Sequence, residues 1–198
     1  MKNLYIYGDS NTYGYDPSEY LTFRYREDLI WTEKLRKALS GKWTIFADGQ
    51  NGREIPGHDL EFSALFFRME KACPVDLFII MLGTNDLLVS MYPDPAKVGE
   101  RMRNALMRIS EKVAPERIMV IAPPLIRMPA ENGWPAVDTS DGSLSRALRD
   151  AAGDAGCLFL DSVPWDSPLA FDGVHLSEDG HRVFAEHLIS WFKEHEAG

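Results

Sequence analysis

Residues 76–82, which read DLFIIML, form one of the longest apolar runs in this chain of 198 residues. Successive side chains of a strand point to opposite faces, so such a run places apolar groups on both sides. Strands of this kind are typical of parallel sheets whose two faces are covered by helices. The run therefore predicts a strand that is buried on both faces.

Further apolar strand segments alternate with amphipathic helical segments along the chain. The predicted strands are residues 4–7, 43–47, 76–82, 117–122 and 157–160. The predicted helices are residues 29–39, 58–71, 95–113 and 143–155, and a last helix that begins at residue 177. This alternation implies right-handed crossovers and a mostly parallel sheet. We therefore predict one α/β domain over residues 1–198, a flavodoxin-like three-layer α/β/α sandwich around a five-stranded sheet.

The formal net charge of −9 argues against nucleic acids and anionic membranes as partners, because both bind basic surfaces. The apolar runs are too short to cross a bilayer, and the first residues do not resemble a secretory leader. We therefore expect a cytoplasmic protein without membrane insertion. Cys73 and Cys157 lack the spacing of metal ligands, and we expect buried free thiols there.

Polar or glycine-rich turns follow four of the predicted strands. These turns are Gly8-Asp9-Ser10-Asn11, residues 48–52, Gly83-Thr84-Asn85-Asp86 and Asp172-Gly173-Val174-His175. Each one taken alone is explained as an ordinary turn, because these residue types favour turns. However, the carboxyl ends of parallel strands meet at one edge of a sheet, where α/β proteins build their sites. The convergence of the four turns therefore predicts a functional site.

Ser10 is a candidate nucleophile if a histidine takes its proton. His175 is the best placed, because it follows the last strand and Asp172 can accept a hydrogen bond from its Nδ1–H. Taken alone, a capped turn with a space-filling histidine explains this pair equally well. The other histidines, which we expect at solvated or half-buried surface positions, are His58, His181, His187 and His195. The six-residue steps between three of the histidines do not align on one helix face, so we predict no metal site.

Acyl transfer also requires hydrogen-bond donors for the negative charge that develops on the carbonyl oxygen. The side chain of Asn85 and the backbone N–H groups of Gly52 and Ser10 are the candidates. The alternative role for Asn85 is an Asx turn. Gly49 and Gly57 are nearby alternatives to Gly52.

Together, these segments resemble, in order, the four sequence blocks of the SGNH hydrolases, also called GDSL-type esterases and lipases. The matching segments are Gly8-Asp9-Ser10, Gly52, Gly83-Thr84-Asn85-Asp86 and Asp172-Gly173-Val174-His175. The resemblance implies the SGNH hydrolase fold and a serine esterase that needs no cofactor. It implies Ser10 as nucleophile and His175 as base, oriented by Asp172. It also implies an oxyanion hole formed by Ser10, Gly52 and Asn85.

One residue departs from the GDSL motif, because Asn11 stands in the place of the leucine. Ser10 is not surrounded by a Gly-x-Ser-x-Gly pattern, which excludes the ordinary nucleophile elbow of α/β-hydrolases. Residues 8–17 are similar to the arylesterase and acyltransferase branch of the family, whose members favour short acyl chains and often form oligomers. The resemblance thus implies a small-molecule substrate, a short-chain acyl or acetyl ester, and a homo-oligomer as a candidate assembly.

Alternative activities within the family are a carbohydrate O-deacetylase and a thioesterase or lysophospholipase that acts on longer acyl chains. Further candidates for contact with the substrate are Asp9, Tyr13, Leu125 and Val174, although Asp9 also suits stabilisation of its turn. The irregular residues 127–141 are a candidate lid or binding loop.

A flavodoxin-like ligand-binding module without catalysis is the alternative from a different class. In such a module, Ser10, Thr12 and Asn85 would bind a phosphate group. Asp9 and Asp16 in the same region argue against this alternative, because carboxylates repel phosphate.

Overall fold

The computed structural model describes residues 1–19 and 21–195, so residues 20 and 196–198 of the predicted domain lie outside the described residues. The order of strands in the main sheet is β2 (Trp43–Gly49), β1 (Lys2–Gly8), β3 (Leu77–Met81), β4 (Ile118–Ala122) and β7 (Leu158–Asp161). All neighbouring pairs in this sheet are parallel. This is the 2-1-3-4-5 strand order of flavodoxin-like folds, and it confirms the predicted fold class.

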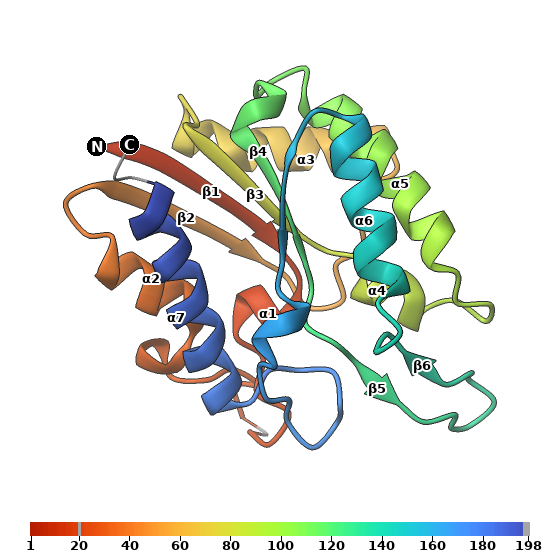
Figure 1. The fold of residues 1–198 in the computed structure, drawn as a ribbon. Coiled ribbons are helices and arrows are strands. Elements are labelled where there is room, and N and C mark those ends of the chain that lie inside the picture. Colours follow the sequence, from red (N-terminus) through yellow and green to blue (C-terminus); the bar gives the residue numbers. More distant parts are fainter. Residues whose placement is uncertain (20, 196–198) are drawn as a thin grey trace.

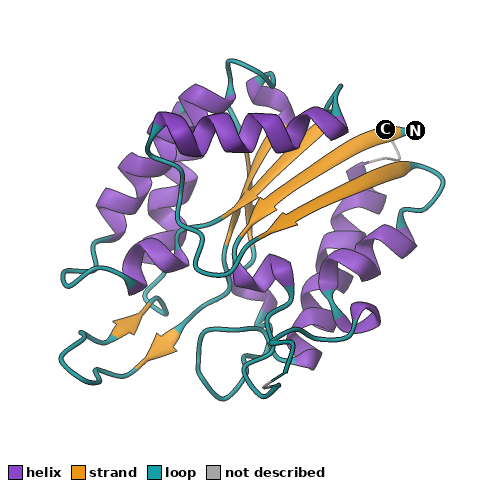
Figure 2. Cartoon of the chain, turned by 180° about the vertical axis from the view of Figure 1, so that it is seen from behind, coloured by secondary structure: helices purple, strands orange, loops and turns teal. Residues whose placement is uncertain are grey.

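Helices cover both faces of the sheet, as Figures 1 and 2 show. One face carries α2 (Trp31–Ala38) and α7 (Glu178–His195), which pack against each other. The other face carries α3 (Asp59–Met69), α5 (Pro95–Ile109) and α6 (Ser143–Asp154). Alternate side chains of a strand enter the two apolar layers: Ile80 of β3 packs in the layer of α5, and Ile79 in the layer of α7. The predicted three-layer sandwich is confirmed.

Local signals determine where the long helices begin. Asp94 caps α5 by accepting the Ala96 N–H at 3.0 Å, and Pro95 occupies the first helical position, where no N–H is needed. The Ser177 hydroxyl accepts the Gly180 N–H at 3.1 Å at the start of α7. The 3₁₀ helices are η1 (Glu27–Leu29), η2 (Glu70–Ala72), η3 (Pro115–Arg117) and η4 (Val163–Trp165).

Two short helices replace turns that the sequence indicated. They are α1 (Ser10–Tyr13), directly after β1, and α4 (Thr84–Leu88), directly after β3. Ser10 is the first residue of α1, and Asn85 is the second residue of α4. The site is therefore positioned by helix starts that follow neighbouring strands.

The segment of residues 127–141 is less irregular than expected. It forms an antiparallel pair of two-residue strands, β5 (Arg127–Met128) and β6 (Val137–Asp138). Strands this short leave no alternation of apolar and polar residues that a sequence pattern can reveal. The Arg127 N–H donates to the Gly173 carbonyl at 2.9 Å, so the base of this hairpin contacts the loop that carries Asp172. A role as a lid stays a prediction.

Two further expectations concern the cysteines and the membrane. Both cysteines are free thiols, as predicted, and Cys157 is half-buried. The predicted burial of Cys73 is wrong: Cys73 is exposed, because it lies in the surface turn between η2 and Pro74.

In the ranges that the structure describes, no helix has the length and apolar character needed to cross a bilayer.

Candidate active site

The candidate site lies at the carboxyl ends of the central strands. In this strand order the topological switch point, where open α/β sheets bind ligands, lies between β1 and β3. Ser10 follows β1, Gly52 follows β2 and Asn85 follows β3. The loop between β7 and α7 brings Asp172 and His175 to the same edge.

A tight cap holds Ser10 at the first position of α1. The carboxylate of Asp9 accepts the Asn11 N–H at 2.9 Å and thereby caps the helix. The Ser10 N–H, at the first helical position, therefore has no acceptor within the helix. Asp9 is fully buried, and this burial raises the pKa of its carboxyl group to about 6.

Two glycines allow α1 to lie directly against the strand ends. A Cβ at Gly8 would lie 2.0 Å from the Thr12 hydroxyl oxygen, and a Cβ at Gly49 would lie 2.2 Å from the Tyr13 backbone nitrogen. Any larger residue at either position would push the helix away from the sheet. Glycine at positions 8 and 49 therefore lets α1, and with it Ser10, lie close to the sheet.

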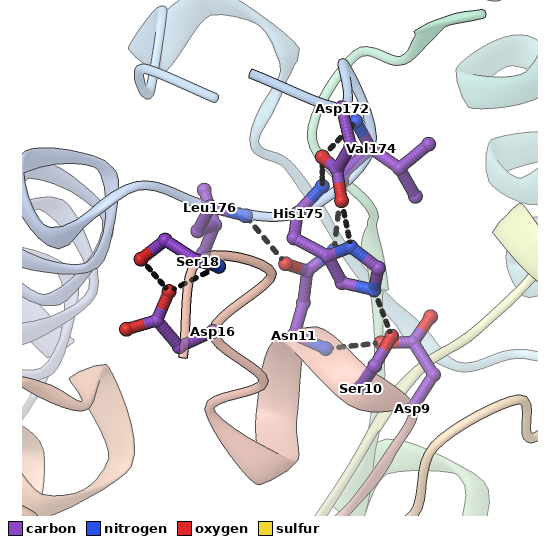
Figure 3. Close-up of polar contacts among 9 residues, drawn as sticks. All are labelled: Asp9, Ser10, Asn11, Asp16, Ser18, Asp172, Val174, His175 and Leu176. Carbon is purple, nitrogen blue, oxygen red and sulfur yellow. Dashed lines mark hydrogen bonds and ion pairs between the residues drawn. The ribbon is translucent and has the colours of Figure 1, made fainter. Parts of the chain in front are cut away.

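His175 contacts both of its predicted partners (Figure 3). Its Nε2 lies 2.9 Å from Ser10 Oγ, and its Nδ1 lies 2.6 Å from Asp172 Oδ2. Because an ionised carboxylate only accepts hydrogen bonds, Nδ1 carries the proton and Nε2 is left to accept the Ser10 hydroxyl proton. The three predicted triad residues thus come together across 165 positions of sequence.

The Asp172 carboxylate is held in its ionised form. Burial raises its pKa, but hydrogen bonds from the His175 side chain and from the backbone N–H groups of His175 and Val174 outweigh burial, so the pKa lies below its ordinary value. Gly173 permits this tight turn: its φ is +70°, and a Cβ there would lie 2.3 Å from the Arg127 carbonyl oxygen. The Tyr15 ring packs against the His175 imidazole, with 4.5 Å between the ring centroids.

Two of the candidate oxyanion donors, Gly52 and Asn85, come from the segments that follow β2 and β3. Asn85 donates one N–H of its amide to the Arg53 carbonyl oxygen at 2.9 Å, which leaves its second N–H for a ligand. Gly52 is exposed and has a φ of +71°, a conformation that favours glycine. Of the two alternatives, Gly49 packs against α1, and the Gly57 N–H donates to Glu61 at 2.7 Å. Gly52 therefore stays the candidate among the three glycines, and the role of its N–H as an oxyanion donor stays a prediction.

Arg53 is a buried residue of the site that sequence reasoning missed. Its guanidinium donates to the Gly8 carbonyl at 2.8 Å and to the Asp48 carboxylate at 2.7 Å, and also reaches the Asp48 carbonyl. It lies over the Tyr7 ring, 4.1 Å from the centroid. Arg53 thus joins the loop of Gly52 to the end of β1. Its only signal in the sequence is the carboxylate five residues earlier, at the end of a strand.

Asp86 of α4 contacts the same loop. Its carboxylate accepts the Ile55 N–H at 3.2 Å and lies 3.1 Å from Arg101, which also pairs with Glu54 at 2.7 Å. Burial of Asp86 outweighs the nearby positive charge of Arg101 and raises the carboxyl pKa to about 6. Neighbouring residues of α4, Asn85 and Asp86, therefore both hold the segment that follows Gly52.

The other predicted substrate contacts have different surroundings. Tyr13 is half-buried beneath the Arg24 guanidinium, 5.0 Å from its ring centroid, and Val174 is buried among apolar residues. Leu125 lines a cavity of about 250 Å³ together with Arg127 and Leu169. The carboxylate of Asp9 is used as the N-cap of α1. Contact of these four residues with a substrate stays a prediction.

One histidine differs from its predicted surface position. His181 is fully buried, and its Nδ1 faces the Trp31 N–H at 3.4 Å, whereas His187 and His195 are exposed as expected. Burial lowers the pKa of His181 to about 3, so the residue is neutral in the folded protein. The prediction is wrong because His181 lies on the side of α7 that packs against the start of α2.

Comparison with known proteins agrees with this geometry. Residues 6–183 match the GDSL-like Lipase/Acylhydrolase family. The GDSL lipase Rv0518 of Mycobacterium tuberculosis is 26% identical over 199 residues, which cover 92% of this chain and 78% of that protein.

Two solved structures show the same likeness. The inhibitor-bound aryl esterase of M. smegmatis superposes with a TM-score of 0.81 at 25% identity, covering 98% of this chain and 99% of that chain. A carbohydrate acetylesterase family member from Sinorhizobium meliloti gives a TM-score of 0.79 at 25% identity, covering 98% of each chain. The chain therefore belongs to the GDSL-like lipase/acylhydrolase family and is a carboxylic ester hydrolase.

Proposed function

We propose that the chain hydrolyses short-chain acyl or acetyl esters through an acyl-enzyme on Ser10. The observation that carries this proposal is the continuous hydrogen-bonded series from Ser10 Oγ through His175 to Asp172, with distances of 2.9 and 2.6 Å. Serine becomes an effective nucleophile only when a base receives its proton, and this series supplies that base already oriented.

In the first half-reaction, Ser10 Oγ attacks the ester carbonyl carbon while its proton passes to His175 Nε2. The Asp172 carboxylate stabilises the imidazolium that forms. The tetrahedral oxyanion accepts hydrogen bonds from the Ser10 N–H, the Gly52 N–H and the free amide N–H of Asn85. His175 then donates the proton to the alcohol oxygen as the C–O bond breaks, which leaves an acyl group on Ser10.

In the second half-reaction, water attacks the acyl carbon while His175 accepts one proton from it. Collapse of the second tetrahedral intermediate breaks the bond to Ser10 Oγ, which regains a proton from His175. The products are one carboxylic acid and one alcohol. The same base thus serves both half-reactions.

The preference for a short acyl group rests on the aryl esterase and carbohydrate acetylesterase structures to which this chain is similar. The similarity to a GDSL lipase supports the alternative, an enzyme that acts on esters of longer acyl chains. A panel of nitrophenyl esters with acyl chains from acetyl to palmitoyl, extended by acetylated sugars, separates the two. We expect kcat/KM to be highest for acetyl or butyryl esters and to fall at least about 10⁴-fold in Ser10→Ala. A maximum at long acyl chains would contradict the short-chain proposal, and hydrolysis at a rate near that of the wild type in Ser10→Ala would contradict the mechanism.

A further inference from the structure

Asn11 connects the nucleophile to the loop that carries the base. Its side chain is buried, with 2% of its surface exposed, and it directly follows Ser10. Its Oδ1 accepts the Leu176 N–H at 2.8 Å, and its Nδ2 donates to the Val174 carbonyl at 3.3 Å. These two backbone groups flank His175 on either side, as Figure 3 shows.

The chemistry of these contacts specifies an amide. One backbone partner is a donor and the other is an acceptor, so the side chain must offer both an acceptor and a donor within one short group. The leucine of the GDSL motif offers neither, and an aspartate offers only the acceptor. Asn11 is therefore a departure from the motif that gives the chain a contact the motif residue cannot make.

Asn11 itself is anchored in the core. Its backbone N–H is held by the Asp9 carboxylate at 2.9 Å, and its carbonyl accepts the Trp31 indole N–H at 2.9 Å. Trp31 is fully buried and faces the equally buried His181 through its backbone N–H. The amide that holds the His175 loop is thus attached to the packed layer of α2 and α7.

We propose that Asn11 is a positioning residue for the reaction: it fixes the His175 backbone relative to α1 and thereby sets the distance between His175 Nε2 and Ser10 Oγ. This inference rests on the proposed function of Ser10 and His175. A shift of about 1 Å between reacting groups can lower the rate by about 100-fold. Two hydrogen bonds to the backbone groups of Val174 and Leu176, on either side of the base, can therefore be decisive for kcat.

The test compares Asn11→Leu, which loses both hydrogen bonds, with Asn11→Asp, which keeps only the acceptor. The matched control is Asp76→Ala, because Asp76 also joins distant segments, accepting the Asn3 N–H at 2.7 Å, but at the opposite edge of the sheet. For each variant, kcat is divided by the concentration of active sites, which a serine-directed phosphonate titrates. KM and the melting temperature are measured on the same preparation.

We expect kcat per titrated site to fall roughly 10- to 100-fold in Asn11→Leu and by less in Asn11→Asp, with KM changed by less than about threefold. Asp76→Ala should keep the wild-type kcat whatever its melting temperature. If Asn11→Leu does not fold, the comparison of Asn11→Asp with wild type decides the question. An unchanged kcat per site in the folded Asn11 variants would overturn the positioning role. Failure of the phosphonate to label Ser10 in the wild-type protein would instead overturn the proposed function.

Discussion

The two halves of the site are built in different ways. In the nucleophile–base half, Ser10, His175 and Asp172 contact one another directly through side-chain hydrogen bonds of 2.9 and 2.6 Å. In the oxyanion half, the candidate donors Gly52 and Asn85 are placed through Arg53, whose carbonyl accepts from Asn85. The geometry of the nucleophile–base half therefore depends on the functional side chains themselves. The geometry of the oxyanion half depends on the buried residue Arg53.

The largest effect is expected from the half whose groups contact one another. Ser10→Ala and His175→Ala should each lower kcat by roughly 10⁴- to 10⁶-fold, because each removes a partner of the same proton transfer. The double variant should be scarcely slower than either single variant, since the two residues act as a unit. Steady-state kinetics of the three proteins checks this. Losses that multiply in the double variant would show that the two side chains act independently.

The oxyanion half should give the next largest effect. Asn85→Ala should lower kcat by about 10²- to 10³-fold, or about 3–4 kcal/mol, with KM nearly unchanged, because the donor acts on charge that develops only in the transition state. Asn85 also holds the Arg53 carbonyl, so kcat per titrated site and melting temperature must be measured together. A lower melting temperature with unchanged kcat per site would leave Asn85 only a structural role.

Arg53 and Arg68 provide a matched pair for the support behind the oxyanion half. Both pair with Asp48, but only Arg53 is buried and reaches the Gly8 carbonyl. Arg53→Met should lower the unfolding free energy by about 2–3 kcal/mol. This loss is smaller than that for a buried carboxylate left without any partner, because Arg68 and Tyr5 still donate to Asp48. Arg68→Met should cost less than about 1 kcal/mol, since its pair is partly exposed. Denaturant unfolding of the two variants checks the difference, and equal losses would contradict the account of Arg53.

The stability of the layer of α2 and α7, to which Asn11 is attached through Trp31, should depend on pH. Because burial lowers the pKa of His181 from 6.5 to about 3, the unfolded chain binds a proton there that the folded chain does not. Stability is thus lost as the pH falls below 6.5, by about 2 kcal/mol at pH 5. His181→Asn keeps an acceptor near the Trp31 N–H and removes the titration. Asp9 and Asp86, whose raised pKa values act in the opposite direction, are present in both proteins.

The measured quantity is therefore the difference in unfolding free energy between wild type and His181→Asn at pH 7 and at pH 5. We expect it to change by about 2 kcal/mol in favour of the variant at the lower pH. A difference that does not depend on pH would mean that His181 does not stay neutral in the folded protein.

The sequence predicted the parts of the molecule that depend on local signals. The strand at 76–82 and its alternation with helices gave the sheet and its layers. The turn residues after the strands gave the positions of Ser10, Asn85 and His175. Each of these signals lies within a few residues of the feature it predicts.

The parts that the sequence did not predict depend on distant partners. His181 is buried against Trp31, 150 positions away, Arg53 reaches Gly8, 45 positions away, and Asn11 contacts Leu176, 165 positions away. Nothing in the residues adjacent to these three distinguishes them from surface or turn residues. In the sequence, Asn11 stands out only as a departure from the GDSL motif, yet its side-chain partners lie in the loop that carries His175.

The most direct test of the central claim is covalent labelling by a serine-directed phosphonate, followed by mass spectrometry of the digested protein. We expect one equivalent of label on Ser10 in the wild-type protein, and greatly slowed labelling in His175→Ala, because the base must take the Ser10 proton for attack. Label on another residue, or labelling of Ser10 at the wild-type rate without His175, would contradict the claim that these two side chains form the nucleophile and its base.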